Sequence, residues 1–166
     1  MNQDVVSATR YCVVDRNEYF MLEALKEAKK AYKIGEIPVG AVIVLDDKII
    51  ARGYNKREKE NSAISHAEIN AIKKANKKLD SWRLEDCVLY VTLEPCPMCA
   101  GAIIQSRVKE VYFAAKDPKT GAAGSQLNLF DYKFNHQVNY HGGLMEQESK
   151  ELIQDFFRKL RNNSIN

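Results

Sequence analysis

The chain has 166 residues, of which 45% are hydrophobic and 28% are charged, and its formal net charge is +3. These values fit one globular domain with a sizeable core, and so small a positive charge does not by itself indicate a nucleic-acid-binding protein. The four cysteines are too few for a disulfide framework, no segment approaches the length of a membrane span, and residues 1–15 lack the pattern of a signal peptide, so we expect a cytoplasmic protein.

The apolar positions of the chain repeat with helical and strand periods in turn. Asn17 can cap a first helix, which ends at Gly35, and Ser62 or Ser65 can begin a second one. Two further helices are expected, at residues 97–105 and 145–161. β-Branched and apolar runs predict five strands, at residues 39–45, 48–53, 88–92, 108–114 and 137–140. This alternation predicts an α/β domain in three layers, with helices on both faces of a central sheet.

The chain shows no internal repeat and no linker, so we interpret residues 16–161 as a single domain. Residues 1–15 form a leader to which the sequence assigns no function, and residues 162–166 form a polar tail. The least regular stretch is residues 116–136, which begins with a segment rich in glycine and alanine. Long irregular segments inside compact domains are often functional, so a functional loop is expected here.

Two short motifs carry the chemistry: His66-Ala67-Glu68 and, further along the chain, Pro95-Cys96-Pro97-Met98-Cys99. A catalytic zinc site has three protein ligands and keeps one position for water, and His66, Cys96 and Cys99 supply that ligand set. Glu68 is placed beside the metal to transfer protons rather than to bind it. The combination H-x-E…P-C-x-x-C is the signature of the zinc nucleobase deaminases. The sequence therefore predicts a zinc-dependent deaminase.

Each half of this pattern has a simpler interpretation when taken alone. A single C-x-x-C can be a redox pair, and a structural zinc site closes with four protein ligands, which would require Cys12, Cys87 or a second histidine. Glu68 could be an ordinary helix N-terminal acid that the helix dipole stabilises. Asn55, which follows a predicted strand, could be a turn residue or could hydrogen-bond a base edge.

Several segments outside the zinc motif extend the pattern over residues 17–161. They are residues 36–42 (EIPVGAV), 53–55 (GYN), 89–94 (LYVTLE), 100–102 (AGA), 117–125 (DPKTGAAGS) and 155–158 (DFFR). With these segments the chain resembles the bacterial tRNA-specific adenosine deaminases of the cytidine deaminase superfamily. The resemblance implies a three-layer α/β/α cytidine-deaminase-like fold with a mixed five-stranded sheet. It also implies hydrolytic deamination of adenosine to inosine at the wobble position of a tRNA anticodon.

The resemblance further implies one Zn²⁺ per subunit, a homodimer, and the tRNA anticodon stem-loop as partner. In such enzymes the residue corresponding to Asn55 contacts the base, the stretch from Ile37 to Val39 walls the pocket, and a terminal helix helps to hold the anticodon loop. The substrate-binding residues that it implies are Ile37, Pro38, Val39, Asn55, Ala67, Asp117, Lys119 and Arg158.

Two other functions remain open from the sequence. The same zinc chemistry serves deaminases of a free base or nucleoside, such as cytosine, cytidine or guanine, and these need no basic face beside the pocket. A non-catalytic zinc subunit that binds RNA would be expected to lack the proton-transferring carboxylate, whereas Glu68 is present.

Overall fold

The computed structural model describes residues 14–163, so most of the predicted leader and the last three residues of the predicted tail lie outside the described residues. The helices are α1 (Arg16–Lys33), α2 (Ala67–Leu79), α3 (Pro97–Gln105) and α4 (Glu146–Asn163), with a short 3₁₀ helix η1 (Leu129–Asp131). The strands are β1 (Gly40–Leu45), β2 (Lys48–Tyr54), β3 (Val88–Leu93), β4 (Glu110–Ala115) and β5 (Asn139–Gly142). Within this part of the chain, none of the helices has the length and hydropathy needed to cross a membrane.

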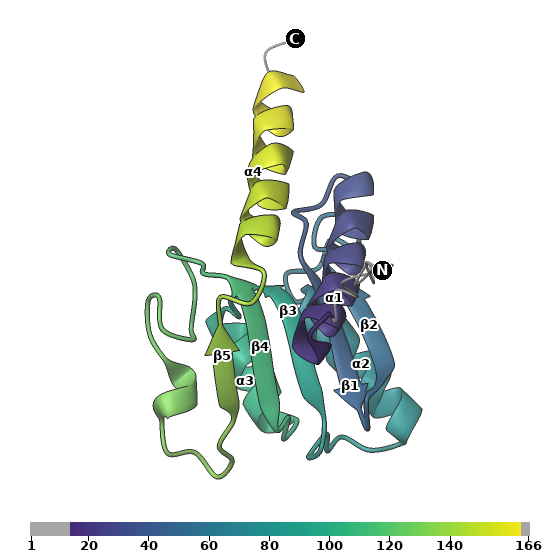
Figure 1. Ribbon diagram of the computed structural model, residues 1–166, viewed down its shortest axis with the longest axis vertical. Coiled ribbons are helices and arrows are strands. Elements are labelled where there is room, and N and C mark those ends of the chain that lie inside the picture. The colour runs from purple at the N-terminus through teal and green to yellow at the C-terminus, as the bar shows by residue number, and fades with distance from the viewer. Residues whose placement is uncertain (1–13, 164–166) are drawn as a thin grey trace, which may run out of the picture.

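The five strands form one mixed sheet in the order β2-β1-β3-β4-β5 (Figure 1). β1 pairs antiparallel with β2 and with β3, whereas β3, β4 and β5 run parallel. The turn between β1 and β2 is the predicted Asp46-Asp47, and both residues have positive φ, as a type I′ hairpin requires. Because β3 and β4 are parallel, the segments that follow them meet at the same end of the sheet.

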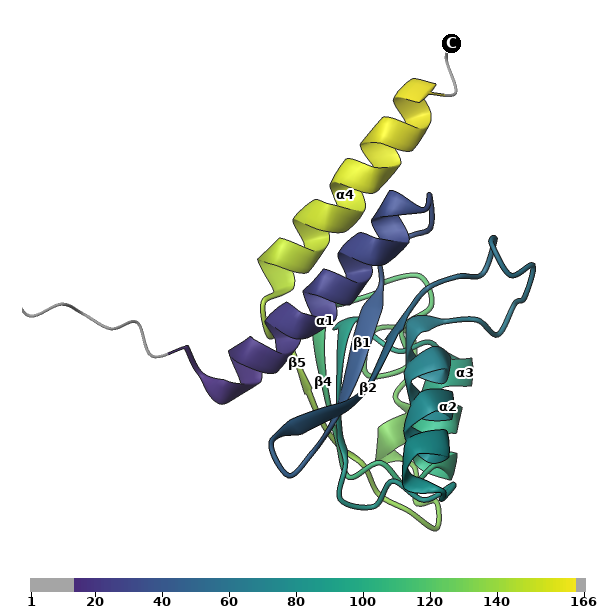
Figure 2. The ribbon, with the colours of Figure 1, turned by 90° about the vertical axis from the view of Figure 1, so that its right-hand side faces the viewer.

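Helices cover both faces of the sheet, with α1 and α4 on one side and α2 and α3 on the other (Figure 2). The alternation of side chains along β1 explains this: Ala41 and Ile43 pack in the core beneath α2 and α3, whereas Val42 and Val44 pack against α1. In the same way, Tyr90 of β3 contributes to the α1 side. The predicted three-layer α/β/α fold with a mixed five-stranded sheet is confirmed.

Two predicted helix starts are wrong. Asn17 does not cap the first helix, because α1 already begins at Arg16 and the Asn17 side chain instead accepts a hydrogen bond from the Tyr90 hydroxyl at 2.7 Å. Neither Ser62 nor Ser65 begins the second helix, because His66 occupies the N-cap position of α2. At Asn17 a contact with the distant strand β3 replaces the capping bond, whereas the Ser65 hydroxyl donates to Glu60 in the same loop.

Helix α1 packs on β1 at a position where only glycine fits. A Cβ atom on Gly40 would lie 2.2 Å from the Ala24 carbonyl oxygen and 2.3 Å from the Ala28 nitrogen, and backbone cannot move aside as a side chain can. We expect Gly40→Ala to lower the free energy of unfolding by about 3 kcal/mol or more, at the upper end for overpacked cores. Urea unfolding measures this difference.

Gly101→Ala is the matched control, because nothing lies within 4 Å of a Cβ atom at that helical position. It should stabilise the protein by roughly 0.5–1 kcal/mol through helix propensity. Equal stabilities of the Gly40→Ala variant and the unmodified protein would show that α1 is not packed against β1 as described.

Candidate metal centre and active site

The three predicted metal ligands lie at the starts of two helices on the same face of the sheet. His66 is the N-cap residue of α2, and Cys96 is the N-cap residue of α3. Pro97 follows at the first position of α3, where its missing N–H leaves no helical hydrogen bond unmade, and Cys99 is one turn further along. Both helices therefore direct the positive ends of their dipoles toward the ligands, which favours thiolate at the N-cap residue Cys96, whereas the hydrogen bond to Cys96 raises the pKa of Cys99.

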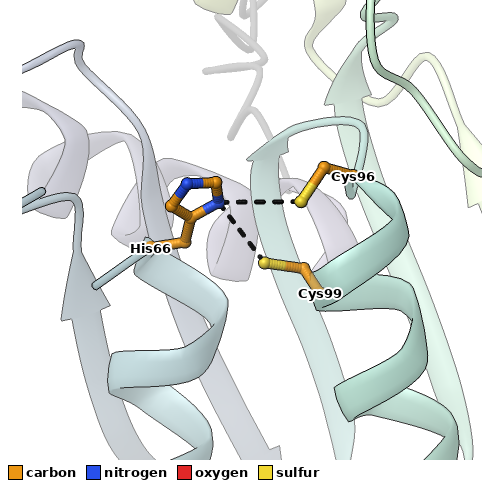
Figure 3. Close-up of side chains that lie close together, drawn as sticks. All are labelled: His66, Cys96 and Cys99. Atoms are coloured by element: carbon orange, nitrogen blue, oxygen red, sulfur yellow. Dashed lines mark hydrogen bonds between the residues drawn. The ribbon is translucent and has the colours of Figure 1, made fainter. Parts of the chain in front are cut away.

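The donor atoms have the spacing that a tetrahedral zinc site requires. Nδ1 of His66 lies 3.7 Å from Sγ of Cys96 and 3.6 Å from Sγ of Cys99, and Figure 3 shows the imidazole directed at both sulfur atoms. Zinc bonds of about 2.3 Å to sulfur and about 2.0–2.1 Å to nitrogen, at tetrahedral angles, separate the two kinds of donor by about 3.6 Å. The three side chains therefore fit a metal ion of this size and preference.

The environment of Cys96 favours the form of sulfur that binds metals. Hydrogen bonding from Cys99 and then from His66 lowers the pKa of Cys96 to about 4, so its sulfur is a thiolate at neutral pH. Thiolate, not thiol, is the metal ligand. A closed site with Cys87 as fourth ligand is excluded, because Cys87 precedes β3 whereas Cys96 follows it, and that strand spans about 20 Å.

Glu68 lies in the first turn of α2, two residues after the histidine, and is 4% exposed. Burial raises the pKa of Glu68 to about 7. A carboxyl group with this pKa can both accept and donate a proton near neutral pH, which is what a general acid–base requires. Glu68 also lines the cavity described next, so its carboxyl group can reach a bound molecule.

A small cavity of about 170 Å³ opens beside the predicted ligands. It brings together eight of the residues that the sequence predicted, namely Ile37, Val39, Asn55, His66, Ala67, Glu68, Cys96 and Asp117. Its other lining residues were not predicted, and they are Arg57, Leu93, Glu94 and Thr120. The wall therefore combines apolar side chains from 37–39 and β3 with polar groups from three loops.

Asn55 is buried in the cavity wall and held by hydrogen bonds on both sides of its amide. Its Nδ2 donates to the Ile37 carbonyl at 3.3 Å and to Glu36 at 3.5 Å, and its Oδ1 accepts from the Arg57 N–H at 3.2 Å. Glu36, which is 2% exposed, also accepts the Lys59 N–H at 2.7 Å. These contacts fix the orientation of the amide beside the cavity.

Four predicted residues lie outside this cavity. Cys99 and Pro38 are buried behind its wall. Lys119 lines a neighbouring hollow of about 400 Å³, which shares Asp117 and Thr120 with the cavity and is also lined by Lys150 and Phe157 of α4.

Arg158 is on α4 and pairs with Asp155 at 2.5 Å. Asp155 in turn accepts the Tyr32 hydroxyl of α1 at 2.5 Å, so the projecting part of α4 is tied to its neighbour. The hydrogen bond from Tyr32 and the pairing with Arg158 lower the pKa of Asp155 to about 2.

The unpredicted cavity residues gave little signal in the sequence. In the sequence, Glu94 and Glu36 are charged residues next to apolar strands, which gives no reason to expect burial. Only the folded chain shows that both are buried. Arg57 and Thr120 lie in loops where arginine and threonine are ordinary. The cysteine motif that follows Glu94 directly was the one available pointer to it.

Comparison with known proteins gives concordant results. Residues 14–161 match the family model of the MafB19-like deaminases. The tRNA-specific adenosine deaminase of Bacillus subtilis (strain 168) is 52% identical over 147 residues, which cover 88% of this chain and 91% of that protein.

Solved structures agree with this assignment. A structure from studies of A-to-I editing by tRNA:A34 deaminases at the wobble position of transfer RNA superposes with a TM-score of 0.78 at 44% identity, covering 81% of this chain and 98% of that one. The guanine deaminase of Bacillus subtilis gives a TM-score of 0.57 at 35% identity, covering 71% and 86% of the two chains. The chain therefore belongs to the family of tRNA-specific adenosine deaminases.

Proposed function

We propose that this protein is a zinc-dependent enzyme that hydrolyses adenosine to inosine at the wobble position of a tRNA anticodon. The observation that carries the proposal is the set of His66 Nδ1 and two cysteine sulfur atoms at tetrahedral spacing, with the buried Glu68 at the same cavity. Membership in the tRNA-specific adenosine deaminases supplies the substrate class. His66, Cys96 and Cys99 would hold one Zn²⁺ in each subunit.

Zinc in such a site supplies an acidified water molecule near neutral pH. Glu68 takes a proton from the attacking water and delivers it to ring nitrogen N1 as the oxygen adds to C6 of adenine. Glu68 then moves the second proton of that water to the exocyclic amine, which leaves as ammonia, so that the 6-oxo base of inosine remains. Its pKa of about 7 suits both transfers, because proton affinity is matched to the working pH.

The cavity wall orients the base for this attack. The fixed Asn55 amide presents a polar group to the base edge, and Ile37 and Val39 supply apolar contacts to its ring. Ala67, between His66 and Glu68 in the chain, also lines the cavity, where a larger side chain would reduce the space for the base. Only an unstacked base can enter such a cavity, and anticodon loops expose their bases, so extruding one costs little.

The basic residues near the cavity support an RNA partner. Lys119, Lys116 and Lys150 line the neighbouring hollow, and the last turns of α4 carry Arg158, Lys159 and Arg161. We propose that these side chains contact the backbone of the anticodon stem-loop. Asp117 is different, because its Oδ1 accepts the N–H groups of Lys119 and Thr120 at 3.0 and 3.2 Å, so we propose that it shapes the loop. We further propose that the enzyme acts as a homodimer.

A deaminase of free bases is the second candidate, because a guanine deaminase shares the fold at 35% identity. The deciding experiment incubates the purified protein with an adenosine-bearing anticodon stem-loop and, separately, with free guanine, cytosine and cytidine. We expect inosine in the RNA and no product from the free compounds. Turnover of guanine without inosine formation would replace the proposal by the second candidate.

Removing the cations of α4 should weaken binding of tRNA without affecting the chemistry. Replacing Arg158, Lys159 and Arg161 together by alanine should raise KM for the stem-loop roughly tenfold, because phosphate contacts contribute much of the affinity for nucleic acids. The slope of log affinity against log salt should fall by about two, since each single-stranded phosphate contact contributes about 0.7. Metal content and kcat should stay unchanged.

A triple alanine variant of Lys73, Lys77 and Lys78 is the matched control. It removes the same charge from exposed positions in the C-terminal half of α2, whereas the cavity lies at the N-terminus of that helix. We expect it to bind tRNA normally. Equal KM values and salt slopes for both triple variants would remove α4 from the RNA-binding surface.

A further inference from the structure

Glu94 is a buried carboxylate in the cavity wall that the mechanism above does not use. It follows β3 directly, precedes Pro95-Cys96, and is 2% exposed. A buried ionised carboxylate is stable only when hydrogen bonds replace its lost water. The donors that replace it come from residues 117–125, which we call the 117–125 loop.

Four donors of this loop converge on the Glu94 carboxylate. Its Oε1 accepts the N–H groups of Ala123 at 2.9 Å and of Ser125 at 3.0 Å. Its Oε2 accepts the N–H of Asp117 at 2.9 Å and the hydroxyl of Ser125. A carboxylate offers about four lone-pair sites, so these donors occupy them all and leave none for a substrate proton. Glu94 therefore holds the loop, whereas Glu68 is placed for proton transfer.

The loop passes so close to the carboxylate that only glycine fits at its nearest point. A Cβ atom on Gly121 would lie 2.3 Å from the Glu94 carboxyl carbon and 2.6 Å from the Asp117 carbonyl oxygen. The next residue adds a backbone bond, since the Ala122 N–H donates to the Pro95 carbonyl at 2.8 Å. The loop is thus bound to the two residues that directly precede the ligand Cys96.

The same loop presents side chains to the cavity. Thr120 and Asp117 line it, and the Thr120 hydroxyl donates to the Asp117 carboxylate at 2.6 Å. Lys119, which lines the neighbouring hollow, sits between them in the chain. A shift of the loop would therefore move one wall of the cavity together with Lys119, while the metal ligands and Glu68 stay at the starts of α2 and α3.

We propose that Glu94 is a positioning residue for the proposed reaction. It fixes the 117–125 loop against the ligand-bearing segment and so sets the wall that receives the target nucleotide. The effect on substrate binding rests on the proposed function. The fixing of the 117–125 loop by Glu94 does not. Its consequence is specific: loss of the carboxylate should weaken substrate binding more than it slows the chemical step.

Glu94→Gln tests this in the metal-loaded enzyme. Glutamine replaces one oxygen by an amide nitrogen, so two of the four donors lose their acceptor and face another donor. We expect KM for the adenosine-bearing stem-loop to rise about tenfold, with kcat within about threefold of the unmodified enzyme and metal content unchanged. Hydrogen exchange should accelerate in the peptide that covers the 117–125 loop.

Glu27→Gln is the matched control, because Glu27 is equally buried at 2% but lies on α1, where it pairs with Lys30 and Arg52. It should leave KM and exchange of the loop unchanged, even if it lowers stability. Ser125→Ala removes one donor and should raise KM less than Glu94→Gln does. Gly121→Ala should displace the Glu94 carboxylate and raise KM as much as Glu94→Gln does. The double variant of Gly121→Ala and Glu94→Gln should have the same KM as either single variant.

Two results would overturn the inference. One is Glu94→Gln with unchanged KM and unchanged exchange of the loop; the other is an equal rise in KM for Glu27→Gln, which would indicate a general loss of structure. The exchange measurement needs no substrate. If the unmodified protein fails to deaminate the stem-loop, the proposed function fails, and exchange in the Glu94→Gln loop still decides whether this carboxylate positions it.

Discussion

Glu68→Ala should retain the metal and lose nearly all turnover. The carboxyl group is not among the three donors, so its removal leaves the His66, Cys96 and Cys99 site complete. The two proton transfers lose their carrier, and general acid–base catalysis is typically worth about a hundred- to ten-thousand-fold in rate. Metal analysis of the purified variant, together with an inosine assay on the stem-loop, measures both effects.

Glu85→Ala is a suitable control for this variant. Glu85 is exposed beside Arg83 in the segment that precedes β3, at the opposite end of that strand from the cavity. It should keep full metal content and full turnover. A Glu68→Ala protein that emerges without metal would identify Glu68 as a ligand or as a support of the ligands, and the assignment as proton carrier would be wrong.

Cys96→Ser and Cys99→Ser should each lose both the metal and the activity. A neutral hydroxyl is a far poorer zinc ligand than a thiolate. A site with only three protein ligands should not retain zinc when one of them is lost. The effect on turnover should equal or exceed that of Glu68→Ala, because the acidified water is lost with the metal. Zinc content by elemental analysis is the decisive measurement, since it is independent of any substrate.

Cys87→Ser is the matched control. Burial raises the pKa of the Cys87 thiol to about 11, and Cys87 precedes β3, at the opposite end of that strand from Cys96. The variant should keep its zinc. Loss of zinc from Cys87→Ser would instead indicate a structural site with four ligands, which was the alternative that the sequence left open.

The sequence predicted the layers, the elements and the metal ligands because these depend on residue type and spacing, whereas most of the cavity wall was predicted from the family resemblance. Successive apolar residues in β1 point to opposite faces of the sheet and must be buried on both. The sequence therefore predicted helices on both faces. The histidine and the cysteine pair were recognisable because few side chains bind zinc. The mixed direction of the strands, by contrast, was implied by the family resemblance and not by periodicity, and the order of the strands was not predicted.

Features that depend on contacts made only in the folded chain could not be predicted. The Ser65 hydroxyl donates to Glu60 at 2.5 Å and so does not cap α2, although serine is a preferred capping residue. Glu94 was missed because its donors are mainly backbone N–H groups, and these leave no trace in the identity of the loop residues. The role of such a carboxylate can be recognised only in the folded structure, where the loop surrounds it.

The division of the metal ligands between two helices also links metal supply to folding. His66 follows β2 and the cysteines follow β3, and β1 lies between these strands in the sheet, so the full donor set exists only after β1 has paired with both. The unfolded chain offers only the local cysteine pair and binds the ion weakly. A ligand that prefers the native state this strongly adds about 4 kcal/mol to its stability at a thousand times its dissociation constant. We therefore expect the stability of the folded chain to rise with the concentration of free metal.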